Sequence, residues 1–150
     1  FNETNEMLAK KTTAAVNQGL TVLFCVGETL QERESGSHFD IIKSQISEGL
    51  FHLNAKDMSL VVVAYEPVWA IGTGLTASSD QAEEVHAFIR SLLTEKFGEA
   101  ISEDVSILYG GSVKPDNAAE LFSQKNIDGG LIGGAALKAR DFFDIIKAIK

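Results

Sequence analysis

The sequence has few cysteines, few prolines and no long hydrophobic run, and each scarcity excludes a class of protein. Its 150 residues contain one cysteine, so no disulfide can form within the chain. No apolar run approaches the roughly 20 residues that span a bilayer. The first residues, Phe1 to Thr4, do not resemble a signal peptide. We therefore expect a cytoplasmic setting and no membrane partner.

Positive charge is scarce as well. The chain has 13 lysine and arginine residues against 21 aspartate and glutamate residues, and its formal net charge is −8. No basic block opposes this charge, which argues against nucleic acid and against an anionic membrane surface as partners. Any anionic ligand must therefore be held by local donors.

The composition is that of a soluble globular protein, with 45% hydrophobic and 23% charged residues. A closed domain of this length buries roughly 68 to 70% of its unfolded surface, which is enough for a substantial core. We find no linker or domain boundary and treat residues 1–150 as part of one domain. The sequence opens without methionine and almost directly into a helical pattern, which indicates a chain that starts in the middle of a fold.

Hydrophobic periodicity predicts a helix followed by four strand–helix repeats. The predicted strands are Thr21–Val26, Leu60–Tyr65, Val105–Tyr109 and Gly130–Ile132. The first helix is expected to start at Asn2, Thr4 or Asn5 and to end at Gly19, and the others to include Phe39–Leu53, Ser78–Leu93, Ala118–Phe122 and Phe142–Ile149. Continuous apolar strands are typical of a parallel sheet that is covered on both faces. The predicted fold class is therefore α/β with a parallel sheet.

The cysteine and the three histidines are not predicted to take part in chemistry. Cys25 lies inside the first predicted strand without a basic neighbour in sequence, so we expect a buried structural thiol rather than the alternative, a nucleophile. His38, His52 and His86 lie in helical or polar stretches and do not follow a strand directly, so we expect all three at the surface.

Glu66 is the first candidate for a functional residue. It stands between Tyr65 and Pro67, directly after an apolar strand, and a proline-hinged segment that ends in the glycines of 72–74 follows it. A lone carboxylate among apolar residues is costly unless chemistry requires it. Glu66 is therefore predicted to be a general base under a mobile lid, and the alternative is a solvated acid in a surface turn.

Two glycine pairs follow the third and fourth predicted strands, Gly110-Gly111 and Gly133-Gly134. In parallel sheets and in barrels, ligands bind at the carboxyl ends of the strands. Glycine lets backbone amides approach an anion closely, although one Gly-Gly pair taken alone is often only a turn. The two pairs together predict a phosphate site built from the backbone amides of Gly72, Ser112, Gly133 and Gly134.

A carboxylate base, a lid that excludes water and an amide-built phosphate site suit removal of a proton next to the carbonyl of a small phosphorylated sugar. Such a reaction also needs an electrophile on the carbonyl oxygen, and no histidine, lysine or asparagine follows a predicted strand end. Lys114 and Lys138 lie near the glycine pairs in sequence and are expected to be solvated. The residues thus predict one part of an active site.

Four segments together resemble the triose-phosphate isomerase family over essentially the whole chain. They are Ala64–Gly74, which is similar to the family's signature loop, Cys25–Glu28, Tyr109–Val113 and Asp128–Ala135. The resemblance implies the C-terminal half of a closed eight-stranded (β/α) barrel of the TIM type, from the helix after strand four to the last helix. It also implies an isomerase of glycolysis and gluconeogenesis that needs no cofactor or metal and is a homodimer when complete.

The resemblance further implies a role for each matching residue. Glu66 is implied to move a proton between the two carbons of dihydroxyacetone phosphate and glyceraldehyde 3-phosphate. The residues implied to bind the substrate phosphate through main-chain amides are Gly72, Ser112, Gly133 and Gly134. The lid hinges correspond to Pro67-Val68-Trp69 and Leu75-Thr76-Ala77, and the pairs implied to exchange hydrogen bonds as the lid moves are Glu28 with Trp69 and Tyr109 with Ala77.

The family's lysine, histidine and dimer-forming loop fall outside this sequence. Four strands cannot close a barrel, and they would leave two sheet edges and an apolar face uncovered. We therefore expect the first half of the barrel, or a second copy of this chain, as a partner. The alternatives are an inactive half-barrel that binds phosphate or self-associates, and a different barrel enzyme with the same phosphate site.

Overall fold

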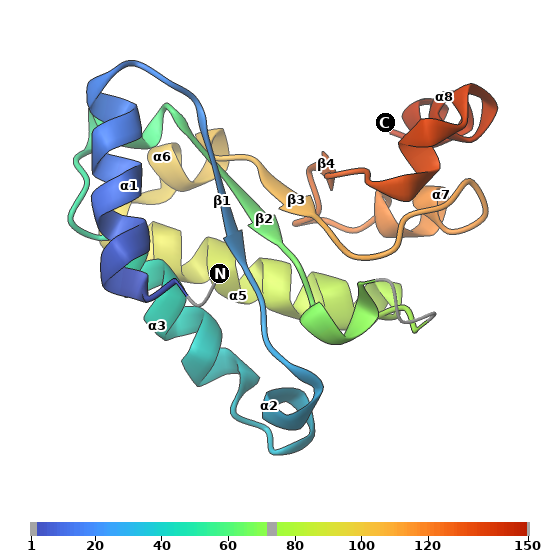
Figure 1. Ribbon diagram of the computed structural model, residues 1–150, viewed down its shortest axis with the longest axis horizontal. Coiled ribbons are helices and arrows are strands. Elements are labelled where there is room, and N and C mark those ends of the chain that lie inside the picture. The colour runs from blue at the N-terminus through green and yellow to red at the C-terminus, as the bar shows by residue number, and fades with distance from the viewer. Residues whose placement is uncertain (1–2, 72–74, 150) are drawn as a thin grey trace.

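The computed structural model describes residues 3–71 and 75–149 and contains one parallel sheet with helices packed against it (Figure 1). The strands are β1 (Val22–Val26), β2 (Val61–Tyr65), β3 (Ile107–Tyr109) and β4 (Gly129–Gly130). The helices are α1 (Asn5–Asn17), α2 (Leu30–Glu34), α3 (His38–Leu50), α4 (Ala55–Met58), α5 (Ser79–Phe97), α6 (Glu99–Asp104), α7 (Ala118–Leu121) and α8 (Ala139–Lys147). Two 3₁₀ helices, η1 (Val68–Ala70) and η2 (Gly134–Leu137), follow β2 and β4.

The four strands lie in the order β1-β2-β3-β4, and every neighbouring pair is parallel. Sequential order with parallel pairing requires a crossover after each strand, and the helices supply it. The register pairs Val26 with Tyr65 and Tyr65 with Tyr109, so the carboxyl ends of β1, β2 and β3 are level. The predicted fold class is confirmed: this is the strand–helix arrangement of half a barrel.

Local signals in the sequence explain both ends of α1 and the start of α5. The side chain of Thr4 caps α1, and Gly19, with φ of 72°, takes the left-handed conformation just after its end. Ser78 and Gln81 form the predicted capping box at the start of α5. Three short helices, α2, α4 and α6, are absent from the predicted elements, because their four to six residues make too few turns to show a periodic pattern.

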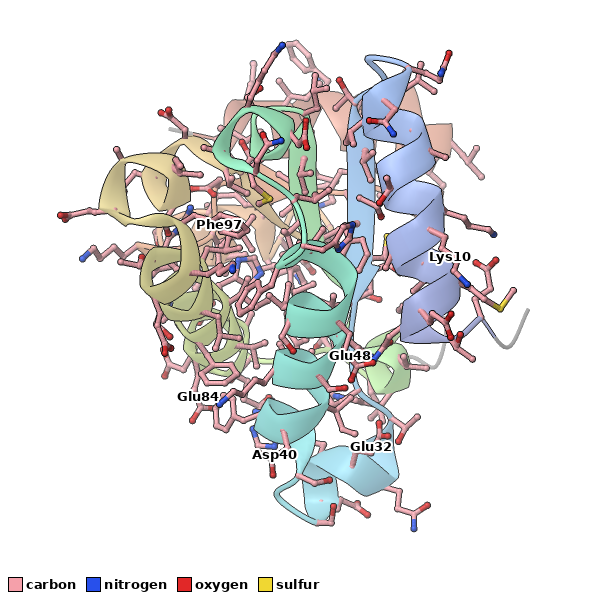
Figure 2. All side chains as sticks on the ribbon, turned by 90° about the vertical axis from the view of Figure 1, so that its left-hand side faces the viewer. Lys10, Glu32, Asp40, Glu48, Glu84 and Phe97 are labelled. Carbon is pink, nitrogen blue, oxygen red and sulfur yellow. The ribbon has the colours of Figure 1, made fainter. Side chains whose placement is uncertain are left out.

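The core lies between the sheet and its helices. Figure 1 shows α1 and α3 beside β1, with α5 across the sheet and α7 and α8 at the far end near β4. The core residues contributed by α3, α5 and the strands include Ile42, Ile46, Ile89, Leu93, Val63 and Ile107. Exposed charged residues on the outer side of the helices include Lys10, Asp40, Glu48 and Glu84, which are labelled in Figure 2. Among the described residues, no helix has both the length and the apolar character to cross a membrane.

The sheet is covered on one face only by the described chain, which corrects two predictions. Leu23 is 47% exposed and Cys25 is exposed, so β1 is not a strand covered on both faces and Cys25 is not a buried thiol. The physical reason is the period of two in a strand, which places these two side chains on the face opposite the helices. Val62 of β2 and Leu108 of β3 lie on this face as well and are half-buried, whereas the small side chain of Ala64 between its neighbours is buried.

The histidine prediction holds for His52, which is exposed, and is wrong for His86, which is fully buried. His86 lies on the inner side of α5 against the rings of Tyr65 and Tyr109, and its Nδ1 donates to the carbonyl oxygen of Asn126 over 3.1 Å. Burial lowers the pKa of His86 to about 4, so the ring is neutral at pH 7.

Candidate active site

Glu66 lies at the centre of the carboxyl edge of the sheet. Its backbone N–H donates to the Val26 carbonyl over 2.7 Å, and the Gly110 N–H donates to the Tyr65 carbonyl over 2.7 Å. These bonds extend the strand pairing past the ends of β1, β2 and β3. Glu66 is therefore placed by backbone hydrogen bonds on both sides rather than by a flexible turn.

Two glycines make room for Glu66. A Cβ on Gly27 would lie 1.8 Å from the Glu66 carbonyl oxygen, and a Cβ on Gly110 would lie 2.5 Å from Glu66 Cγ. Real Cβ atoms do not approach other atoms so closely, so a Cβ on Gly27 would clash with the backbone of Glu66, and a Cβ on Gly110 would displace the Glu66 side chain. Gly27 and Gly110 thus fix the path of the Glu66 backbone and side chain between two neighbouring strands.

The surroundings of Glu66 favour its protonated form more than water does. Burial raises the pKa of the half-buried Glu66 carboxyl, and a hydrogen bond from the Cys25 thiol partly opposes this rise. Desolvation and then the charge of Glu66 raise the pKa of Cys25, so the thiol stays protonated and donates. A carboxylate with a raised pKa is a stronger base at neutral pH. The contact with Cys25 was missed from sequence because the cysteine was expected to point into the core.

Glu28 and Trp69 lie together, as the resemblance implied. Glu28 is completely buried, and its Oε1 accepts from Trp69 Nε1 at 2.8 Å and from the Tyr65 hydroxyl at 3.0 Å. Arg33 of α2 places a guanidinium nitrogen 3.7 Å from the same oxygen. The contact of Arg33 with Glu28 could not be predicted from the sequence, because Arg33 lies in a short helix that the periodic pattern does not reveal.

The segment after Glu66 is anchored at its start. Pro67 is buried, and the Val68 N–H donates to the Glu28 carbonyl over 3.0 Å. The segment then forms η1 and leads towards residues 72–74. Gly72, one of the predicted phosphate donors, lies outside the described residues.

Tyr109 and Ala77 are neighbours, as the resemblance implied. Burial raises the pKa of Tyr109, and the backbone of Ala77 is near enough to oppose that rise. The buried Tyr109 hydroxyl nevertheless has no hydrogen-bond partner among the described residues. The exchange of hydrogen bonds during lid movement stays a prediction for both pairs.

One cavity brings together Glu66 and three of the four predicted phosphate-binding residues. It has a volume of about 740 Å³ and is lined by Glu66 and by the glycine-rich segments after β3 and β4. Its lining residues include Glu66, Ile71, Gly111, Ser112, Gly133 and Gly134. The cavity is not lined by the other predicted residues Glu28, Trp69, Tyr109 and Ala77. They lie near the segment that follows Glu66, as the pairs Glu28 with Trp69 and Tyr109 with Ala77.

Three backbone amides are available in this cavity. Within the described residues, no hydrogen bond uses the N–H of Ser112, Gly133 or Gly134, while the Ser112 hydroxyl donates to the Ala70 carbonyl over 3.1 Å. A Cβ on Gly133 or Gly134 would meet no atom within 4 Å, so crowding within the described chain does not explain these glycines. Lys114 and Lys138 also line the cavity, and both are exposed, as expected.

No group of three or more metal-binding side chains is found in residues 3–71 and 75–149. The described polar side chains of the cavity are the Glu66 and Asp141 carboxylates, the Ser112 hydroxyl and the solvated Lys114 and Lys138, and the unpaired amides lie on residues that line it. This arrangement can hold a small anion at one end and accept a proton at the other.

Comparison with known proteins agrees with this arrangement. The family model described as triosephosphate isomerase matches residues 1–149. Proteins named triosephosphate isomerase from Cytophaga hutchinsonii and Flavobacterium johnsoniae are 58% and 55% identical to the chain over 148 and 149 residues, which is 99% of the chain in both cases. The protein of that name from Pelodictyon phaeoclathratiforme is 60% identical over 148 residues, also 99% of the chain.

The match covers only part of each relative. The chain spans 59% of the Cytophaga protein, 60% of the Flavobacterium protein and 58% of the Pelodictyon protein. By its match to the family model over nearly every residue, and by its carboxylate and amide-lined cavity at the strand ends, this chain belongs to the triosephosphate isomerase family.

Proposed function

We propose that residues 1–150 form the C-terminal half of one (β/α)₈ barrel domain that interconverts dihydroxyacetone phosphate and glyceraldehyde 3-phosphate. The observation that carries the proposal is that Glu66 and the unpaired amides of Ser112, Gly133 and Gly134 line the same cavity. A small phosphorylated triose fits a site with an anion-binding end and a basic end. The protein is proposed to act in the cytoplasm, in glycolysis and gluconeogenesis, without a cofactor or metal.

Glu66 is the proposed base. It removes a proton from the carbon next to the carbonyl, which gives an enediolate, and returns the proton to the neighbouring carbon. The raised pKa of Glu66 supports this role, because a base whose conjugate acid is closer to neutral pH removes the proton more readily and then gives it back.

The substrate phosphate is proposed to bind to the amides of Gly72, Ser112, Gly133 and Gly134. The space beside Gly133 and Gly134 supports this role, because a Cβ there would meet no protein atom and would instead occupy the cavity that a ligand needs. Backbone amides bind an anion without lysine or arginine, which agrees with a chain whose net charge is −8.

The segment Pro67–Trp69 and residue Ala77 are proposed to be the ends of a lid over Glu66, with Glu28 and Tyr109 as their hydrogen-bond partners. The bond from Trp69 to Glu28 and the unpaired Tyr109 hydroxyl beside Ala77 support this role. A closed lid keeps water from the enediolate, which would otherwise lose phosphate.

The missing electrophile is proposed to come from the rest of the barrel. None of the three histidines lines the cavity, and Lys114 and Lys138 are both solvated. The uncovered sheet face with Leu23 and Cys25 is the surface on which the first half of the barrel, or a second copy of this chain, would pack. The completed barrel is proposed to be a homodimer.

The Gly110→Ala substitution tests how closely Glu66 must be placed. The added Cβ needs a shift of about 1 Å in the Glu66 side chain, and a misplacement of that size lowers turnover by about 10- to 100-fold. The control is Gly129→Ala, because a Cβ on Gly129 meets only Leu108 at 3.4 Å, an ordinary contact. Equal turnover in the two variants would contradict the placement argument.

A coupled assay tests the proposed function. It uses this chain alone and the completed barrel, meaning this chain joined to the segment that precedes the matched region in the family. Turnover of glyceraldehyde 3-phosphate is expected in the completed barrel and not in the chain alone. Full turnover by the chain alone would refute the missing electrophile, and phosphate binding without turnover in the completed barrel would favour an inactive phosphate-binding module.

A further inference from the structure

Asn117 is a polar residue of the phosphate-binding region to which the proposed function assigns no role. It occupies the N-cap position of α7, where an asparagine side chain ordinarily accepts a hydrogen bond from the first turn of the helix. The Asn117 side chain makes no such bond. It turns back towards the loop that carries Ser112 instead.

The Asn117 side chain binds that loop at two points. Its Nδ2 donates to the Ser112 carbonyl over 3.1 Å, and its Oδ1 accepts from the Lys114 N–H over 2.8 Å. The backbone closes the same turn, because the N–H groups of Asn117 and Ala118 both donate to the Lys114 carbonyl, over 3.2 and 3.0 Å. One side chain thus fixes the peptide groups on both sides of Val113, which is itself buried.

These contacts leave Ser112 with a single free polar group. Its carbonyl is bound to Asn117, and its hydroxyl donates to the Ala70 carbonyl. Only its N–H has no partner among the described residues, and Ser112 lines the cavity. The Ser112 N–H belongs to the preceding peptide, between Gly111 and Ser112. Because the carbonyl and the hydroxyl of Ser112 are both engaged, the residue is held on its other two sides, which limits the positions its N–H can take.

We propose that Asn117 is a positioning residue that orients the Ser112 amide for the phosphate group of the substrate, an inference that rests on the proposed function. Asn117 does not line the cavity, so it acts through the loop rather than on the ligand. A donor held in position beforehand requires no reorganisation when the anion binds. Loss of the side chain therefore weakens interactions with the phosphate and leaves the basic end of the cavity unchanged.

The experiment compares two substrates in the completed barrel. For Asn117→Ala we expect kcat/KM for glyceraldehyde 3-phosphate to fall by about 10- to 100-fold, as for other residues that orient a binding group. For glyceraldehyde, which carries no phosphate, kcat/KM should change by less than about twofold, because binding energy from the phosphate does not enter that reaction. A proportional loss with both substrates would overturn the proposal.

Asn117→Asp separates the two hydrogen bonds of the side chain. An aspartate still accepts from the Lys114 N–H but cannot donate to the Ser112 carbonyl. Its loss with the phosphorylated substrate should therefore be at least as large as that of Asn117→Ala. Near-normal phosphate dependence in the aspartate variant would show that the donor to Ser112 is not what matters, and would contradict the proposal.

Asn54→Ala is the matched control. Asn54 caps α4 by accepting from the Asp57 N–H over 3.0 Å, far from the cavity, so the same substitution removes a comparable side-chain-to-backbone bond. We expect a lower melting temperature and unchanged discrimination between the two substrates. If Asn117→Ala behaves in the same way, its role is structural only and the proposal fails.

Binding of inorganic phosphate distinguishes failure of this inference from failure of the proposed function. The Ser112 amide resonance, followed by NMR during titration with phosphate, should shift in the unsubstituted protein and shift less in Asn117→Ala. A protein that binds phosphate in this way without turnover refutes the isomerase function and keeps the role of Asn117. A protein that turns over with an unaffected Ser112 response in the variant refutes the role of Asn117.

Discussion

The Glu66→Gln substitution lowers kcat of the completed barrel for glyceraldehyde 3-phosphate by about 10²- to 10⁴-fold or more, the range typical of a positioned general base. Glutamine keeps the length and shape of the side chain, so the contacts with Gly27 and Gly110 are retained. It cannot accept a proton at neutral pH. The loss should therefore appear mainly in kcat, with a much smaller change in KM.

The pH dependence of activity provides a second test of Glu66 as the base. Burial raises the pKa of Glu66, so the protonated and inactive form persists to a higher pH than for an ordinary carboxyl. Activity is therefore present above the raised pKa and is lost as the pH falls through it. The residual activity of Glu66→Gln should lack this acid limb.

Glu34→Gln is the matched control for Glu66→Gln. Glu34 ends α2 and is exposed, and it does not line the cavity. Its substitution should leave kcat and the pH profile unchanged. Turnover within about twofold of normal in Glu66→Gln would reject Glu66 as the base, because a positioned base contributes at least about 10²-fold.

The features of the fold that were predicted from sequence are those with local causes. Thr4, Gly19 and the Ser78 capping box mark helix ends by their own hydrogen bonds or backbone angles, and the structure confirms them. The predicted fourth strand, Gly130–Ile132, starts one residue late and is one residue too long, because the two-residue β4 is defined by pairing with β3 and not by its own composition.

The features that the sequence did not reveal depend on how the helices pack against the sheet, which decides whether a side chain is buried or exposed. An apolar strand has the same sequence pattern whether helices cover one or both of its faces. The exposure of Cys25 therefore does not follow from the sequence. His86 lies within a helix rather than directly after a strand, and its burial follows only from the packing of α5 against Tyr65 and Tyr109.

Some residues of the candidate site could likewise be predicted from the sequence, and others could not. Glu66, Ser112 and the Gly133-Gly134 pair were found because strand ends and glycines are visible in sequence, and they line one cavity in the structure. Arg33 and Asn117 were not found, because Arg33 reaches back to Glu28 and Asn117 to Ser112 through turns whose shape the sequence does not specify.

The Arg90→Met substitution lowers the free energy of unfolding of the completed barrel by about 3 kcal/mol, near the low end of the cost of removing the buried partner of an ion pair. Arg90 of α5 is 8% exposed, and one guanidinium nitrogen donates to the carbonyls of Ser102 and Val105. The other donates to Asp128 Oδ2 over 2.6 Å. Methionine keeps much of the volume but leaves these acceptors without their donors.

Asp128 links this network to the sheet. The same Oδ2 accepts from the Ile107 N–H over 2.6 Å, and the Asp128 N–H donates to the Ile107 carbonyl over 3.1 Å. Arg90 therefore joins α5 and the end of α6 to the start of β3 and the approach to β4. The Asp128 side chain is 35% exposed, so water partly replaces the lost partner, and the expected cost lies at the low end.

Urea unfolding measures this cost, with Arg140→Met as the control. Arg140 pairs with Asp144 on exposed α8 over 2.9 Å, and loss of such a helical surface pair costs about 0.5 kcal/mol or less.

In the double variant Arg90→Met with Asp128→Asn, the aspartate charge that lost its partner is absent, while an amide oxygen still accepts from Ile107. The double variant should therefore be more stable than the sum of the two single effects predicts. Additive effects, or a cost for Arg90→Met no larger than for Arg140→Met, would show that Arg90 does not hold α5 and α6 to the strands that carry the phosphate-binding loops.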